Sequence, residues 1–251
     1  MGKNREIKTR GIILRRIPFK ETSFILEMLS EDFGKISVIA KGIRKEKNAN
    51  YGIIDILNEL EVVLYKNPSS EWYIFKSGTL VKAYLYETEF TKSLYMQAAA
   101  EFLLQIIIPE EDAHKLFRLI KDYFDFLGKV IGNEAIVFWR FLLRALVILG
   151  IEINMRNCVI CEKRENFPVA YFPQKSGFIC ENCFRPHLKE EVIELDKKVS
   201  KIIRNIYNSN KLLNDLLLSA ETVSQINSIF LIHLSEHFHK KFHFKTLALI
   251  K

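Results

Sequence analysis

The residues with the clearest chemistry are four cysteines in two pairs. Cys158 and Cys161 form one C-x-x-C pair, Cys180 and Cys183 form the other, and the chain has no further cysteine. Two short loops of this kind can present four thiolates to one tetrahedral Zn²⁺ ion. Because four protein ligands fill every position around such an ion, the spacing predicts one structural zinc per chain and disfavours a catalytic metal.

Other interpretations of the cysteines are weaker. Two disulfides would need an oxidising compartment, whereas the charged start of the chain lacks the apolar stretch of a secretory signal, so we expect a cytoplasmic protein. A redox C-x-x-C motif normally occurs once, near a βαβ unit. His187 is an alternative ligand, although a surface histidine is the simpler interpretation. No H-x-E motif precedes either pair, as a zinc deaminase would require.

The segment between the pairs must bring them together. Pro168, Pro173 and Gly177 punctuate a short extended run over residues 169–172. This composition predicts a hairpin arm between the two cysteine loops.

The charge of the chain is basic and concentrated at its ends. The formal net charge is +7, of which residues 1–50 carry +6 and residues 201–251 carry +4. A localised basic surface is expected for a polyanionic partner, with an ordinary solvated surface as the alternative. The longest apolar run, residues 136–151, contains two arginines and is too short to span a bilayer, so no membrane partner is expected.

The first part of the chain is expected to form strands. Alternating apolar and polar residues bounded by turn residues predict five of them, over residues 11–17, 24–29, 36–40, 60–65 and 72–76. Five short strands fit a small β-barrel, either an OB-fold or an SH3-like barrel. The OB-fold carries a nucleic-acid-binding face.

A basic loop follows the third predicted strand and is the most function-like feature of the barrel. Single-strand binders combine a positive groove with aromatic rings on which bases stack. The candidate DNA-binding cations are Arg15, Arg16, Lys35, Lys41, Arg44, Lys45 and Lys47. The available aromatic residues are Phe24, Phe33, Tyr51, Trp72 and Tyr73, for most of which a place in the core is the simpler interpretation.

Helical periodicity begins near Leu85. Helices are predicted over residues 94–108, ending at Pro109, then 110–127, 134–149 with Gly150 after the last turn, 199–207, 212–218 and 222–238. The expected fold is therefore multi-domain α+β: an N-terminal OB-fold barrel, then a helical domain with an inserted four-cysteine zinc finger. The predicted domain limits are 1–80 for the barrel, 81–154 and 189–251 for the helical domain, and 155–188 for the finger.

We find no catalytic constellation. Phosphate-binding, dinucleotide-binding and nucleophile-elbow motifs are absent from the sequence, so neither an enzyme nor a small-molecule substrate is expected. Arg140 and Arg144 lie one turn apart, which we interpret as the solvent side of a core helix. The spacing around His233 and His237 is not that of H-E-x-x-H, and a basic C-terminal surface is the simpler interpretation of the late histidines.

Several stretches along the chain form a recognisable series. They are residues 9–14 with 21–23, the hairpin return and basic A-K-G-x-R loop at 34–44, residues 141–143 with 149–150, the approach to the second pair with Phe172 and 176–183, and residues 245–247. In this order they together resemble the RecO family of bacterial DNA repair and recombination mediators. Asn154 to Asn157 stand where members often have a proline-containing run, and Ser176 replaces a common glycine; both touch the approach to the metal and not its ligands.

The resemblance implies an OB-fold, a helical domain and a zinc finger, and a role without catalysis. It implies binding of single- and double-stranded DNA, annealing of complementary strands, and contact with RecR and single-strand-binding protein to promote RecA loading, in the bacterial cytoplasm at the nucleoid. A second hypothesis is an RNA-binding OB/zinc-ribbon protein of translation or transcription. A third, a zinc hydrolase, is disfavoured by the four thiolate ligands.

Overall fold

The computed structural model describes residues 5–45, 48–66, 69–86, 88–207 and 218–250. The chain divides into two compact units. The first comprises Met1–Gly128 and Phe244–Ile250, and the second comprises Lys129–His243. The predicted domain limits differ from this division and stay a prediction.

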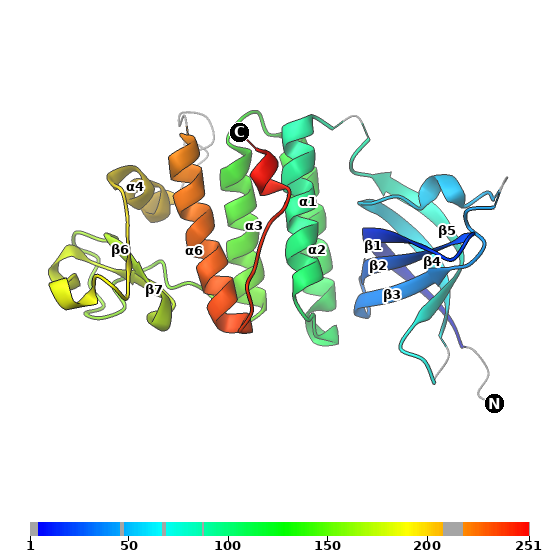
Figure 1. The fold of residues 1–251 in the computed structure, drawn as a ribbon, viewed down its shortest axis with the longest axis horizontal. Helices are drawn as coiled ribbons and strands as arrows, with labels where there is room; N and C mark the ends of the chain where they lie inside the picture. The colour runs from blue at the N-terminus through cyan, green and yellow to red at the C-terminus, as the bar shows by residue number, and fades with distance from the viewer. Residues whose placement is uncertain (1–4, 46–47, 67–68, 87, 208–217, 251) are drawn as a thin grey trace. The chain divides into compact units, whose positions relative to one another are not determined.

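The first unit begins with a closed five-stranded barrel, which has the predicted OB-fold character (Figure 1). Neighbouring strands follow the order β1-β2-β3-β5-β4, and β4 also pairs with β1. All these pairings are antiparallel except the short one between β3 and β5. The strands are β1 (Arg5–Phe19), β2 (Ser23–Ser30), β3 (Gly34–Ala40), β4 (Asn58–Lys66) and β5 (Tyr73–Ala83).

Strand β1 is longer than the sequence predicted and does not stop at Pro18. Its first part pairs with β4 as far as Ile12, and its second part pairs with β2 from Gly11 to Phe19. Pro18 therefore lies where β1 has a neighbour on one side only, which is the kind of strand position that tolerates proline. Strand β5 is also longer than predicted, since its pairing with β4 continues to Ala83.

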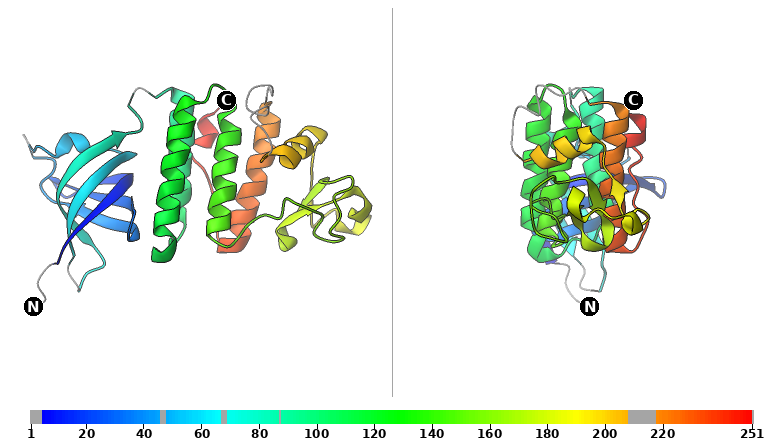
Figure 2. Two further views of the ribbon diagram at one scale, coloured as in Figure 1. Left: turned by 180° about the vertical axis from the view of Figure 1, so that it is seen from behind. Right: turned by 90° about the vertical axis from the view of Figure 1, so that its left-hand side faces the viewer.

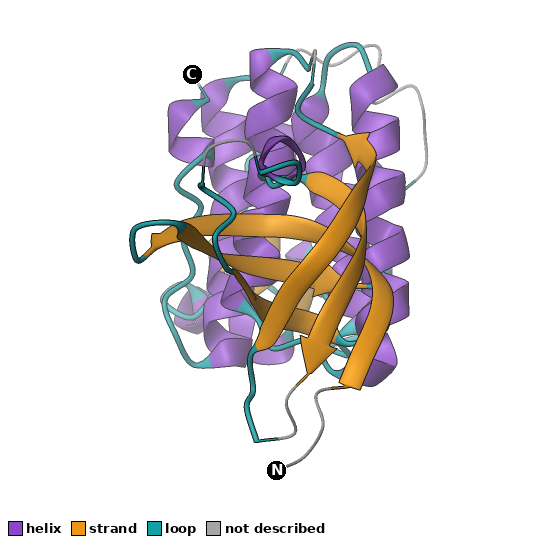
Figure 3. Ribbon diagram, turned by 90° about the vertical axis from the view of Figure 1, so that its right-hand side faces the viewer, coloured by secondary structure: helices purple, strands orange, loops and turns teal. Residues whose placement is uncertain are grey.

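Register shifts bend these long strands enough to close the barrel. They fall beside Leu14 in β1 and beside Lys76 and Val81 in β5. Such bulges increase local twist and curvature, which a closed barrel requires. Figure 3 shows the strands crossing one another around the barrel.

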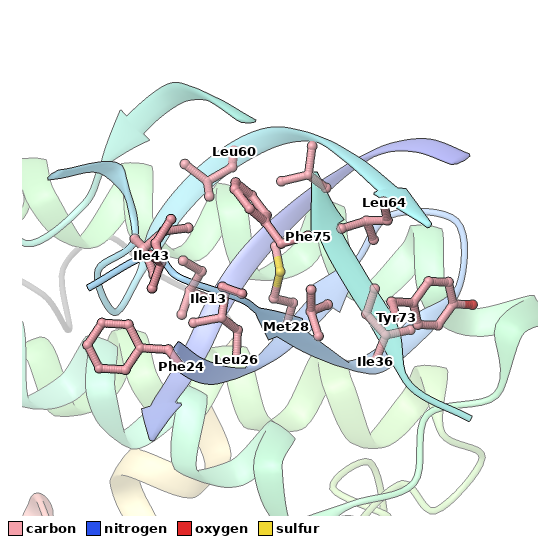
Figure 4. Packing of buried hydrophobic residues seen from close by; sticks show 14 residues of the cluster. Ile13, Phe24, Leu26, Met28, Ile36, Ile43, Leu60, Leu64, Tyr73 and Phe75 are labelled. Atoms are coloured by element: carbon pink, nitrogen blue, oxygen red, sulfur yellow. The ribbon is translucent and has the colours of Figure 1, made fainter. Parts of the chain in front are cut away.

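Apolar side chains on the inner faces fill the barrel (Figure 4). In β3 buried and half-buried residues alternate along the whole strand, as the period of two predicts. Leu26, Met28, Val38 and Leu64 have no exposed surface. Phe24 and Ile43 lie at one end of this cluster (Figure 4).

Two helices complete the first unit. Helix α1 (Phe90–Gln105) begins and ends earlier than predicted, whereas α2 (Glu110–Lys129) starts directly after Pro109 as expected. The two helices are joined by a hydrogen bond from the Tyr123 hydroxyl to the Tyr95 carbonyl, 2.9 Å long. The C-terminal segment returns to α1, where the Thr246 hydroxyl donates to Glu101 Oε2.

The described part of the second unit contains the α-helices α3 (Glu134–Ile148), α4 (Lys197–Asn205) and α6 (Ala220–Phe238) and a small sheet. The sheet has the order β7-β6-β8, with β6 (Ala170–Phe172), β7 (Gly177–Ile179) and β8 (Ile193–Glu194). Helices α3 and α6 lie side by side (Figure 2), joined by a hydrogen bond from Trp139 Nε1 to Asn227 Oδ1. The predicted helix over 212–218 lies almost wholly outside the described residues.

Helix ends in this unit follow the local sequence. Gly150 adopts a φ of +69° immediately after α3, as predicted for the residue that stops a helix.

No helix among the described residues combines the length and apolar character needed to cross a membrane.

Candidate metal centre and basic surface of the barrel

The four cysteine sulfurs come together at one point. All four Sγ atoms lie within 4.8 Å of one another, and Cys161 Sγ is 3.7 Å from Cys180 Sγ. Four thiolates around a zinc ion at about 2.3 Å have sulfurs about 3.8 Å apart. The thiols are unpaired, and those of Cys158 and Cys180 are buried. The cluster can therefore hold a metal ion, and its all-thiolate donor set fits zinc.

A short hairpin builds this cluster. Strand β6 falls on the predicted extended run, and the second cysteine pair begins directly after β7. The first pair is held against the same strand by a 2.9 Å hydrogen bond from the Val159 N–H to the Phe178 carbonyl. A Cβ atom at Gly177 would collide with the Val159 side chain and lie 3.0 Å from the Asn154 Cβ. Only glycine allows the cysteine loop to approach the strand this closely.

The thiols strongly influence one another's protonation. Burial raises the pKa of the Cys158 thiol, but backbone hydrogen bonds from Cys161, Cys180 and Ile160 outweigh burial and bring the pKa to about 7. Burial raises the pKa of the Cys183 thiol. Four thiolates at this separation repel one another, and a divalent cation between them removes that cost.

A buried histidine joins the cysteine module to the helices of the same unit. The Tyr171 hydroxyl in β6 lies 2.8 Å from His233 Nδ1 in α6, and His233 Nε2 lies 2.6 Å from the Ile151 carbonyl. A carbonyl can only accept, so Nε2 donates to Ile151, and Nδ1 accepts the hydrogen bond from the Tyr171 hydroxyl. Burial, opposed by the bond to Ile151 and aided by the charge of His237, lowers the pKa of His233 to about 4. His233 is 1% exposed, so the basic C-terminal surface expected from the sequence does not include it.

The structure sorts the candidate DNA-binding cations by what they already contact. Arg15 pairs with Glu27 at 3.1 Å. The Arg16 guanidinium donates to the Ile54 carbonyl at 2.6 Å and lies 3.5 Å from Asp55. Both cations thus have intramolecular partners that compete with DNA.

Lys35 has a different role. Its ammonium donates to the Leu103, Leu104 and Ile106 carbonyls at 3.2, 2.8 and 2.5 Å. These are carbonyls at the C-terminal end of α1, which have no partner within the helix. This contact caps the C-terminal end of α1, and it leaves Lys35 engaged within the first unit.

Three loop cations remain available. Lys41, Arg44 and Lys45 are exposed, and no carboxylate among the described residues forms an ion pair with them. Lys47 lies outside the described residues.

The loop that carries these cations is fixed to the turn between β1 and β2. The Arg44 N–H donates to the Thr22 carbonyl at 2.9 Å, and the Gly42 N–H donates to the Ser23 hydroxyl at 3.3 Å. Asn48 Nδ2 closes the loop on the Gly42 carbonyl at 3.1 Å. Sequence reasoning missed these anchors, although an asparagine in a polar loop is a recognised sign of such local bonding.

Three of the five aromatic candidates lie in the barrel core or against it, as expected for most of them. Phe24 and Tyr73 belong to the barrel core, and Phe33 packs against it. Tyr51 is 50% exposed and Trp72 is 39% exposed. Tyr51 and Trp72 are therefore the candidate rings on which a DNA base could stack.

Arg140, interpreted from sequence as a solvent-facing residue, is partly buried. Its Nε donates to the Ile206 carbonyl at 2.7 Å, at the C-terminal end of α4, and burial lowers its pKa. Arg144 is exposed, as expected.

Comparison with known proteins agrees with this architecture. Residues 3–84 match the family described as Recombination protein O N terminal, and residues 87–246 match Recombination protein O C terminal. The chain belongs to the RecO family.

Individual RecO relatives differ in how much they align. The DNA repair protein RecO of Prosthecochloris aestuarii is 32% identical over 155 residues, covering 61% of this chain and 59% of that protein. The same-named protein of Pelodictyon phaeoclathratiforme is 30% identical over the same shares of the two chains. That of Caldicellulosiruptor bescii is 26% identical over 91% of both chains. The first two relatives are thus matched over less than two thirds of their length.

Proposed function

We propose that this protein is a non-enzymatic DNA-binding mediator of DNA repair and recombination that anneals complementary single strands. The observation that carries the proposal is the exposed loop of the barrel, where Lys41, Arg44 and Lys45 lie without carboxylate partners among the described residues. Membership of the RecO family supports it.

Annealing of this kind needs positive charge and no catalytic side chain. Two complementary strands repel each other through their phosphates, and cations on the protein surface lower that repulsion. Each phosphate contact releases counterions, which supplies the driving force for capture and makes it salt-dependent. The proposed loop performs this role because its backbone is held on the β1–β2 turn while its cationic side chains are exposed.

The proposal also includes protein partners. The protein would act on DNA coated by single-strand-binding protein, together with RecR, and so help to load RecA. It would do this in the cytoplasm, a compartment that keeps a four-thiol cluster reduced.

We further propose that Cys158, Cys161, Cys180 and Cys183 bind one structural zinc ion. Their sulfur separations and all-thiolate chemistry support this assignment. The metal would stabilise the hairpin module of the second unit and take no part in DNA chemistry. Metal analysis of the purified protein should find one zinc per chain, and a folded protein with four free thiols and no metal would contradict the assignment.

The decisive experiment is annealing of complementary oligonucleotides coated with single-strand-binding protein, without ATP. The test variant replaces Lys41, Arg44, Lys45 and Lys47 by alanine. Each lost phosphate contact lowers the slope of log affinity against log salt by about 0.7 on single strands, so the slope should fall by up to about 3.

A matched control removes the same charge from exposed positions of the second unit. It replaces Lys163, Arg164, Lys189 and Lys198 by alanine. If the test and control variants lose annealing activity equally and their salt slopes fall equally, the barrel loop is not part of the DNA-binding site. Tighter binding of RNA than of DNA oligomers of equal length would favour the RNA-binding alternative.

A further inference from the structure

A layered cluster of aromatic and cationic side chains lies beside the basic loop. The rings of Phe24 and Tyr51 are stacked, with centroids 6.4 Å apart and planes inclined by 26°. The guanidinium carbons of Arg16 and Arg44 lie 4.9 and 5.5 Å from the Phe24 centroid. These distances are in the range of favourable ring stacking and cation–π contacts.

The members of this cluster come from separate parts of the barrel. Phe24 is the second residue of β2, and Arg16 is near the end of β1. Arg44 is in the loop after β3, and Tyr51 is the first residue of the short 3₁₀ helix η1 (Tyr51–Ile53). Backbone bonds fix η1 to the loop, since the Tyr51 N–H donates to the Asn48 carbonyl at 3.1 Å. This local bond sets Tyr51 beside the loop, and the contact with Phe24 of β2 joins its ring to a distant part of the chain.

The two rings differ sharply in accessibility. Phe24 is 6% exposed and Tyr51 is 50% exposed. Phe24 is the covered base of the stack, and Tyr51 is its outer layer with surface open to solvent. Arg16 donates to the Ile54 carbonyl and lies near Asp55, so these partners compete with a phosphate for it. Arg44 has no such bond among the described side chains, and its guanidinium lies against the ring of Phe24, on which Tyr51 stacks.

An exposed aromatic ring flanked by cations fits one ligand chemistry closely. A flat, uncharged ring stacks on the tyrosine, while phosphates joined to it meet Arg44, Lys41 and Lys45. A nucleotide within a single strand has both parts, whereas a base inside a duplex has its faces covered by neighbouring base pairs.

We propose that an unpaired DNA base stacks on the exposed face of Tyr51 while the adjacent phosphates bind the loop cations. This inference rests on the proposed DNA-binding function and adds to it a base-dependent subsite. It makes the barrel selective for single strands, since a duplex can use the cations but not the ring.

The test compares an ordinary single strand with an abasic strand of equal length and phosphate number. The wild-type protein should bind the base-bearing strand more tightly at the same salt concentration. Stacking of one base on a protein aromatic residue corresponds to a difference of roughly 5- to 150-fold in affinity.

Three variants separate stacking from a merely structural role of the ring. Tyr51→Leu keeps an apolar cover over Phe24 and should lose most of the preference for the base-bearing strand. Tyr51→Phe keeps the ring and should retain the preference. Tyr86→Leu removes another exposed tyrosine, 74% exposed, from the same unit and should leave the preference unchanged. Neither Tyr51 variant should alter the salt slope, because neither changes a charge.

The outcomes distinguish this inference from the function on which it rests. Equal wild-type affinity for the two strands, or an undiminished preference in Tyr51→Leu, would overturn the stacking subsite while leaving DNA binding by the loop intact. Failure of the wild-type protein to bind either strand would overturn both proposals. A preference that is lost in Tyr51→Leu and kept in Tyr51→Phe supports the subsite.

Discussion

Replacing Lys35 by methionine should weaken the fold and leave DNA affinity almost unchanged. The sequence grouped Lys35 with the basic residues expected to bind DNA. In the structure its ammonium donates to the Leu103, Leu104 and Ile106 carbonyls at the end of α1. Methionine keeps most of the apolar stem and removes only the charge and the donors.

The expected loss of stability follows from those contacts. A hydrogen bond to a charged group contributes about 1.5–3 kcal/mol, and a cation at a helix C-terminus adds about 0.3–1 kcal/mol. Freezing the lysine side chain costs up to about 2 kcal/mol, which methionine does not recover in full. The net destabilisation should be about 2 kcal/mol, or a fall in Tm of about 4–8 °C for a chain of this size.

Thermal unfolding and DNA affinity, measured on the same preparations, test the reasoning. Lys41→Met is the matched control, since Lys41 is exposed and has no ion-pair partner among the described residues. The control should keep its Tm and lose DNA affinity, and Lys35→Met should do the opposite. A Lys35→Met protein with an unchanged Tm and the DNA affinity of the control would refute the capping role.

Three further predictions concern other contacts. Burial lowers the pKa of His233 to about 4, whereas a histidine in the unfolded chain has a pKa near 6.5. Between these pH values the unfolded chain binds more protons than the folded protein. The free energy of unfolding should therefore fall by up to about 3 kcal/mol as the pH drops from 6.5 to 4. Gly177→Ala should lower the Tm and zinc content, because the new methyl group collides with Val159. Lys121→Met should cost about 3 kcal/mol, because it leaves the buried Glu59 carboxylate without its ion-pair partner.

Each of these predictions has a matched control. His114→Gln removes an exposed histidine and should leave the loss of stability that is caused by burial of His233 in place. Gly128→Ala should not lower the Tm, because no atom lies within 4 Å of the added methyl group. Lys115→Met breaks an exposed pair and should cost under about 1 kcal/mol. For Gly177 and Lys121, an equal change in stability in the control and the test variant would contradict the prediction. For His233 the test variant is His233→Gln, and the prediction is contradicted if the stability of this variant depends on pH as that of the wild type does.

Local sequence patterns predicted the elements well. The five barrel strands were recognised from alternation and turns, because a period of two and a bounding glycine or proline are properties of a few adjacent residues. The stop at Gly150 was predicted for the same reason. Strand ends were less accurate at Pro18 and Ala83, because pairing with a distant strand decides how far a strand continues.

The cysteine spacing also determined a great deal by itself. Two close pairs with a turn-rich segment between them left few arrangements other than a common cluster, and the structure brings the four sulfurs together. Spacing was sufficient here because both thiols of a pair sit on one tight loop, so their separation is a local property.

Only the tertiary structure decided which cations and rings are available to a ligand. The sequence grouped Lys35, Arg16 and Lys41 as candidate DNA-binding cations, yet Lys35 caps a helix, Arg16 lies near Asp55, and Lys41 is exposed. The pairing of Phe24 with Tyr51 was equally invisible. A long side chain reaches partners that are distant in sequence, so its availability depends on how the strands and loops converge and not on its neighbours along the chain.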